Sequence, residues 1–135
     1  MKPNTLLLTL SIVLYTFTAF GQTYPIDTMI MKCKQENSSN LGVLECDMKG
    51  FELWTTEMEK NYDLLFKQMD REGQRMLQEQ QTLWRKMMEA QLEFNHYYYK
   101  NKGTSGMLII SSEKTQIVRK RALELRGHLE RLVLK

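Results

Sequence analysis

Residues 44–69 read LECDMKGFELWTTEMEKNYDLLFKQM and carry the longest helical pattern in the chain. Mostly apolar side chains recur in this stretch at spacings of three and four, which place them on one face of a helix. The members of this first stripe are Leu44, Met48, Phe51, Thr55, Met58, Tyr62, Leu65 and Met69. The pattern predicts a long amphipathic helix that buries this stripe.

Two further stripes with the same spacing follow along the chain. The second consists of Met76, Gln80, Leu83, Met87, Ala90, Phe94 and Tyr97, and the third of Val118, Ala122, Leu125, Leu129 and Leu132. Gly73 is compatible with two local structures. Either a helix ends there and the chain reverses tightly, or one helix continues through the glycine, which lowers the stability of that helix by about 1 kcal/mol. Residues 103–106 are typical of a loop, and Ser111 or Ser112 can cap the third helix.

The composition favours helices, because the 135 residues include only seven glycines and two prolines. This length is that of one domain. Residues 27–33 add a short helical pattern of one or two turns, and Met107–Ile110 is the one apolar run compatible with a strand. We therefore predict an all-α fold, a small helical bundle of three main helices plus a short N-terminal helical segment.

A long coiled-coil dimer is the alternative fold, in which the first two stripes join through Gly73. Bulky aromatic side chains fit poorly into a regular coiled-coil seam, and they argue against this alternative. The residues concerned are Phe51, Trp54, Tyr62, Trp84 and Phe94.

The N-terminus has the pattern of an export signal. Lys2 precedes an apolar run from Leu6 to Phe20, and Ala19 and Gly21 supply small residues for cleavage. A membrane anchor needs about 20 apolar residues, more than this run contains. We predict a signal peptide at 1–21 and a single domain at 22–135, with no transmembrane segment after cleavage and no lipid anchor. The mature protein is then periplasmic or secreted.

Cys33 and Cys46 are the two cysteines of the chain. In an oxidising compartment they are expected to form a disulfide that ties the short N-terminal segment to the first long helix. Met29, Met31 and Cys33 alternate, which is compatible with soft copper ligands. Methionine more often fills a core, so we expect no metal and no cofactor.

No catalytic motif is present in the sequence. His96 and His128 lack metal-ligand spacing, and the chain has neither a phosphate-binding glycine loop nor a nucleophile elbow. A net charge of +3 is too small to indicate nucleic-acid binding. We therefore expect a binding protein rather than an enzyme, with tyrosines 97–99 as either packing or contact residues.

The order of several short motifs resembles the LprI-like lysozyme-inhibitor family of small exported bacterial helical domains. These motifs are Pro25-Ile26-Asp27, Cys33, Asn40-Leu41-Gly42-Val43, Cys46, Trp54-Thr55-Thr56-Glu57-Met58, Tyr62, Leu65, Gln81-Thr82-Leu83-Trp84, Gly103-Thr104 and Arg121-Ala122 with Leu125. The chain departs from the family pattern at Glu59, where asparagine is usual, and at Met88-Glu89, where Arg-Asp is usual.

The resemblance implies a helical domain that binds a protein partner, lysozyme, and inhibits it. Positions expected to be structural are Trp54, Tyr62, Gln81, Trp84, Arg121 and Leu125. An inhibitor must block a cleft that contains two catalytic carboxylates, and an exposed loop with a lysine and hydroxyl groups suits that task. The candidate binding loop is Asn101, Lys102, Gly103, Thr104 and Ser105.

An envelope interaction module without inhibitory activity is the alternative function. Residues 113–135 have an excess of basic over acidic residues, whereas residues 47–72 have the opposite. A basic face on the last helix would contact a cell-wall polymer or another exported protein. Its candidate residues are Arg119, Lys120, Arg121 and Arg126. The sequence does not determine the oligomeric state.

Overall fold

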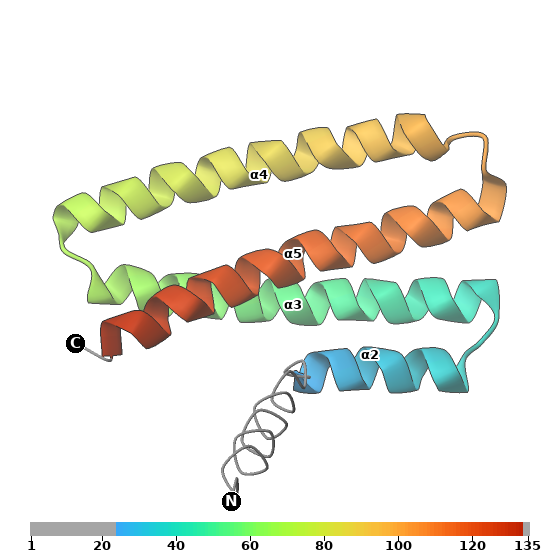
Figure 1. Cartoon of the computed structure of the whole chain (residues 1–135), viewed down its shortest axis with the longest axis horizontal. Coiled ribbons are helices and arrows are strands. Elements are labelled where there is room, and N and C mark those ends of the chain that lie inside the picture. The colour runs from blue at the N-terminus through green and yellow to red at the C-terminus, as the bar shows by residue number, and fades with distance from the viewer. Residues whose placement is uncertain (1–23, 134–135) are drawn as a thin grey trace, which may run out of the picture.

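The structure is a computed structural model in which residues 24–133 are described. This part of the chain contains four helices and no strand (Figure 1). They are α2 (Pro25–Glu36), α3 (Asn40–Gln68), α4 (Arg71–Tyr99) and α5 (Gly103–Val133). The prediction of an all-α bundle with three main helices and a shorter N-terminal one is therefore confirmed. The predicted signal peptide lies outside the described residues.

Local capping determines where the first three helices begin. Pro25 opens α2, because its fixed φ angle suits the first helical turn. The Ser39 hydroxyl accepts a hydrogen bond from the Gly42 backbone N–H at 3.1 Å, so α3 begins earlier than Leu44. The Asp70 carboxylate accepts one from the Gly73 N–H at 2.9 Å and caps α4 in the same way.

Two turns lie at positions other than those expected from the sequence. The chain reverses at Met69 and Asp70, so Gly73 belongs to the first turn of α4. The third long helix begins at Gly103 instead of after Ser112, so both the expected 103–106 loop and the Met107–Ile110 run are helical. Gly103 has a φ of 54°, a left-handed conformation that glycine adopts without strain.

Helix α5 lies between α3 and α4, and α2 covers the opposite side of α3 (Figure 1). The α3–α5 contact is the most extensive in the molecule. The buried core lies mainly along this contact and consists of Trp54, Met58, Leu65, Leu77, Val118, Ala122 and Leu125. Among residues 24–133, no helix combines the length and apolar character that crossing a lipid bilayer requires.

The three predicted stripes differ in how well they match the buried faces. The third stripe is largely correct, because Val118, Ala122 and Leu125 are fully buried. The first is correct in part: Met58 and Leu65 are buried, whereas the Met48 side chain is 61% exposed. The buried residues of α3 are Gly42, Cys46, Asp47, Gly50, Trp54, Met58, Asn61 and Leu65.

The second stripe is wrong, because its residues lie on the exposed side of α4. The fully buried residues of α4 are Leu77, Gln81 and Asn95, and Trp84 and Met88 between them are half-buried and pack on the core. Gln81 and Asn95 are amides. The Gln81 side chain has a hydrogen-bond partner on α5, and the Asn95 side chain has partners on both α4 and α5, so both amides can be buried. A search for apolar residues alone therefore selects the wrong face.

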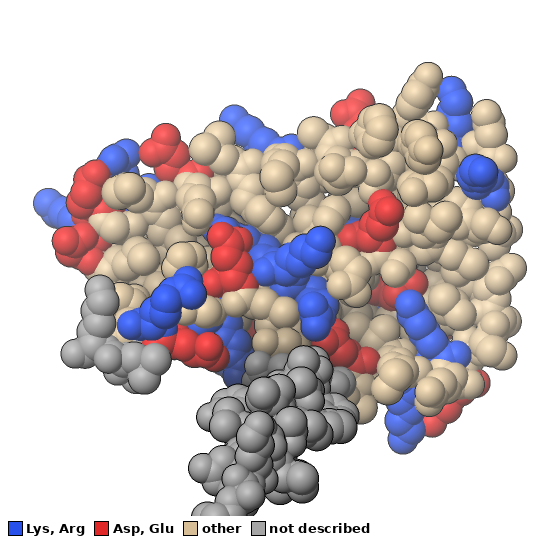
Figure 2. All heavy atoms as spheres, viewed as in Figure 1, with Lys and Arg blue, Asp and Glu red and all other residues tan. Residues whose placement is uncertain are grey.

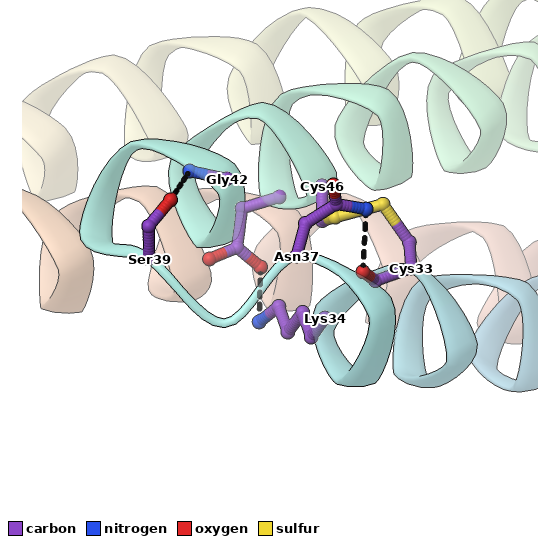
Figure 3. The surroundings of a disulfide bond; sticks show 7 residues. Cys33, Lys34, Asn37, Ser39, Gly42 and Cys46 are labelled. Carbon is purple, nitrogen blue, oxygen red and sulfur yellow. Dashed lines mark hydrogen bonds and ion pairs between the residues drawn. A yellow bond between two sulfur atoms is a disulfide. The ribbon is translucent and has the colours of Figure 1, made fainter.

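Helix α2 has no fully buried residue and is held by a disulfide and two ion pairs. Cys33 and Cys46 form the predicted disulfide, with a Cα–Cα distance of 5.8 Å (Figure 3). The Lys34 ammonium group lies 2.6 Å from the buried carboxylate of Asp47 on α3. The carboxylate of Asp27 pairs with the Arg119 guanidinium on α5 at 2.7 Å. These links join α2 to both long core helices.

Candidate functional site

A cleft of about 670 Å³ runs between α4 and α5. Its α4 side is rich in aromatic, methionine and amide side chains, and its α5 side carries most of its charged groups. Residues that line it include Trp84, Met88, Asn95, Tyr99, Glu113 and Lys120. A mixed apolar and polar lining of this kind is typical of a binding surface.

Arg121 forms the floor of this cleft with its side chain only 2% exposed. Its Nε donates to Gln81 Oε1 at 2.9 Å, and one Nη donates to Gln80 Oε1 at 3.0 Å. The other Nη is 3.0 Å from the Glu124 carboxylate. The guanidinium also lies 5.8 Å from the centre of the Trp84 ring. Because its donors are satisfied, Arg121 joins α4 to α5 and is not available to a partner.

Asn95 makes the second polar link between the two helices. Its Nδ2 donates to the Glu113 carboxylate on α5, and its Oδ1 accepts from Gln91 Nε2 at 2.9 Å. The two polar links lie more than three helical turns apart on α4, and the cleft extends between and around them. These links, together with the packing of Leu77, Trp84 and Met88 in or on the core, hold α4 in the bundle.

The end of the molecule where α4 meets α5 presents the predicted binding loop. Asn101 and Lys102 form the turn, and Gly103, Thr104 and Ser105 form the first turn of α5; all five are exposed. We call residues 100–105 the tip. The Lys100 ammonium group lies 4.2 Å from the centre of the Tyr97 ring. No acidic residue occurs between 94 and 112, so the positive charge of the tip is not neutralised by near neighbours in the sequence.

Gly106 fixes the geometry of the tip, because a Cβ there would lie 2.6 Å from the backbone oxygen of Tyr99. We expect Gly106→Ala to lower the free energy of unfolding by about 1–3 kcal/mol, since backbone must move to relieve the contact. Gly127→Ala is the matched control in the same helix, where the nearest atom lies 3.7 Å away. The control should be stabilising by about 0.5–1 kcal/mol. Denaturant unfolding measures both, and equal effects would contradict the assigned close contact.

The four residues of the predicted basic face do not form one exposed surface. Arg121 is buried, and Arg119 is half-buried and paired with Asp27. The hydrogen bonds with Asp27 raise the pKa of Arg119 above its ordinary value. Arg126 is exposed but pairs with Glu130 at 3.2 Å. Of the four residues, Lys120 is therefore the one that has no ion pair within residues 24–133. Lysine and arginine atoms are accordingly interspersed with acidic ones in Figure 2.

The residues expected to be structural lie in or beside the core. Trp54, Gln81, Arg121 and Leu125 are buried, and Tyr62 and Trp84 are half-buried against the core. The Asn61 amide, which the sequence analysis did not single out, donates to the Ala122 backbone oxygen at 3.1 Å. The one feature of the sequence that pointed to Asn61 is its position directly before Tyr62.

At the Met88-Glu89 departure from the family pattern, Met88 lines the cleft and packs against the core, whereas Glu89 is exposed. An apolar side chain therefore stands in the cleft wall where the resemblance leads us to expect a charged one. Glu59, the other departure, is exposed on α3. Within residues 24–133, no group of three or more His, Cys, Asp and Glu side chains is placed to hold a metal ion.

Residues 31–125 match the protein family described as lysozyme inhibitor LprI. Among solved structures, the crystal structure of an uncharacterized protein from Burkholderia thailandensis is similar, with a TM-score of 0.68 and 30% sequence identity. The similarity covers 78% of this chain and 54% of that chain, so this chain spans about half the length of the Burkholderia protein. No match is found among the curated proteins.

Proposed function

Because the chain belongs to the LprI lysozyme-inhibitor family, we propose that it is an exported protein that binds lysozyme and slows its cleavage of peptidoglycan. The disulfide between Cys33 and Cys46 supports export, since such bonds persist in oxidising compartments. The periplasm or the extracellular space is therefore the proposed location. The proposed role is to protect the cell wall by occupying the enzyme rather than by chemistry of its own.

The tip is the part of the molecule that we propose enters the lysozyme cleft. That cleft contains two carboxyl groups that flank the scissile bond. Lys102 is exposed at the apex of the α4–α5 turn, and hydroxyl groups of Thr104 and Ser105 follow it at the start of α5. An ammonium group and hydroxyl donors complement carboxylates at short range. Figure 2 shows basic atoms at this end of α4 among uncharged residues.

The acid-free, basic tip is the single observation that carries this proposal beyond the family match. The alternative, an envelope module that binds through α5, requires a continuous basic face. Arg121 is buried and Arg119 and Arg126 are ion-paired, so among the four residues of the expected basic face Lys120 alone offers unpaired positive charge to an anionic polymer within residues 24–133. The inhibitor function is therefore the one that we favour.

Lysozyme clearing of a peptidoglycan suspension tests the proposal. We expect a molar excess of the protein to slow the loss of turbidity. The Lys102→Glu variant should inhibit at least about ten-fold more weakly, because reversal of a charge at an interface commonly reduces the binding free energy by about 2 kcal/mol or more. Lys67→Glu is the matched control: Lys67 is exposed in the last turn of α3. The length of α4, 29 residues or about 43 Å, separates it from the tip.

The control should inhibit as the parent protein does. If the parent protein leaves clearing unchanged, inhibition of that lysozyme is excluded. If the parent inhibits and Lys102→Glu inhibits equally well, the tip is not the contact, and the cleft between α4 and α5 becomes the surface to test.

A further inference from the structure

A face of α4 beside the one that packs on α5 carries apolar residues that the rest of residues 24–133 leaves more than half exposed, and two of them, Met87 and Phe94, also line the cleft. Their side chains are between 57% and 68% exposed. They are Met76, Leu83, Met87, Phe94 and Tyr97. A contiguous row of this size on a soluble domain indicates a contact surface.

These residues belong to a strict heptad pattern. With Gln80 and Ala90 they follow one another at alternating spacings of four and three from Met76 to Tyr97. This spacing is that of the a and d positions of a coiled coil, which form a narrow seam against one partner helix. We call these seven positions the seam. The core-facing side of α4 has its own residues, and Gln80 is the one seam residue with a hydrogen bond to another helix of residues 24–133, which it accepts from Arg121.

One flank of the seam carries charges that alternate in sign. Its residues are Glu79, Lys86, Glu93 and Lys100, seven positions apart and all exposed. Lys86 and Glu93 make no ion pair with any described residue of the monomer. The other flank is uncharged and includes Trp84 and Tyr98, which line the cleft beside α5.

We propose that the seam binds the same seam of a second copy of this chain, with the two α4 helices antiparallel. The charge pattern carries this inference. A two-fold axis between residues 86 and 93 brings Lys86 opposite Glu93 of the partner subunit and Glu79 opposite Lys100 of the partner subunit. All four flank positions then face opposite charges, which is the self-complementarity that a two-fold interface requires.

The same register gives a compatible apolar contact. Met87 lies in one layer with Ala90 of the partner subunit, so a large side chain meets a small one at the centre. Leu83 lies in a layer with Phe94 of the partner subunit, so the bulky ring, which a regular seam accommodates poorly, meets an aliphatic side chain and not a second ring. Gln80 lies in a layer with Tyr97 of the partner subunit, where amide and hydroxyl can form a hydrogen bond. The small Ala90 thus lets the two helices approach at the centre of the seam, and larger side chains fill the layers on either side.

A parallel pair satisfies these groups less well. In that arrangement each seam residue meets its own copy, so Phe94 stacks on Phe94 of the partner subunit. The charged flank then faces the uncharged one, and Glu79 lies against Trp84 of the partner subunit. The four flank charges of each subunit then gain no opposite charge from the partner subunit, which makes the antiparallel pair the favoured one.

The molecular mass in solution, measured by light scattering and sedimentation across a wide range of concentration, tests the proposal. We expect the purified protein to reach the dimer mass. The Leu83→Lys variant should remain monomeric, and its helicity should be unchanged because Leu83 is exposed in the monomer. A monomeric parent protein at every concentration would overturn the proposal. So would a Leu83→Lys variant that dimerises like the parent.

A charge swap tests the antiparallel register separately. Lys86→Glu places like charges together at two symmetric positions and should raise the dimer dissociation constant about ten-fold. The double variant Lys86→Glu, Glu93→Lys restores opposite charges and should dimerise as the parent does. A Lys86→Glu variant with parental affinity, or a double variant that fails to recover, would overturn this register. Neither measurement involves lysozyme, so the outcome is independent of the proposed inhibition.

Discussion

Replacement of Trp54 by alanine is expected to lower the free energy of unfolding by about 3–5 kcal/mol. Trp54 is 1% exposed and is the largest side chain that is fully buried. Its ring meets Tyr24 edge to face at 5.9 Å, and the Arg119 guanidinium lies 5.4 Å from the ring centre. Truncation therefore opens a cavity at the point where α2, α3 and α5 meet.

Denaturant titration followed by circular dichroism measures this loss. Met48→Ala is the control in the same helix. Met48 belongs to the stripe that the sequence predicts to be buried, but it is 61% exposed. Its truncation should therefore change the free energy of unfolding by less than about 0.5 kcal/mol. Trp54→Phe should cost less than Trp54→Ala, because the indole Nε1 makes no hydrogen bond with the described residues. If Trp54→Ala unfolds at the parental midpoint, the core assignment is incorrect.

Loss of the disulfide is the second large effect that we expect. Cys33 and Cys46 are separated by 13 residues in the sequence, and closing a loop of that size stabilises a protein by about 3 kcal/mol. A double variant, Cys33→Ser with Cys46→Ser, should show this loss in denaturant. Because α2 buries no residue fully, we expect its amide protons to lose protection from exchange before those of α3 and α5.

Reductant provides the matched control for this variant. The parent protein should lose about the same stability when it is reduced, whereas the double serine variant should not respond. If the variant is as stable as the oxidised parent, the Lys34–Asp47 and Asp27–Arg119 ion pairs and the packing of Ile26 and Ile30 hold α2 without the bond.

Local sequence patterns were enough to predict which helices this fold contains, although not where every turn lies. Three long helical patterns gave α3, α4 and α5, and the cysteine pair gave the link from α2 to α3. The α5 stripe was largely correct because it contains Val118, Ala122 and Leu125, which are buried and apolar, although Thr115 and Arg121 are buried in the same helix. Helix formation depends on backbone hydrogen bonds and side chains within a few residues, and that information is local in the sequence. The turn between α4 and α5 was located only approximately, because Gly103 and Gly106, which predicted a loop, lie at the start of α5.

The side of α4 that faces inward depends on contacts between helices and not on the local pattern. Gln81 and Asn95 are buried because Arg121 and Glu113, far along the chain, supply their hydrogen-bond partners. The sequence pattern does not contain those pairings, so the more apolar side of α4 was assigned to the core although it lies in solvent. The burial of Arg121 likewise removed it from the proposed basic face. A polar group can enter the interior only when its partner is already placed there, and that condition depends on the arrangement of the helices in space.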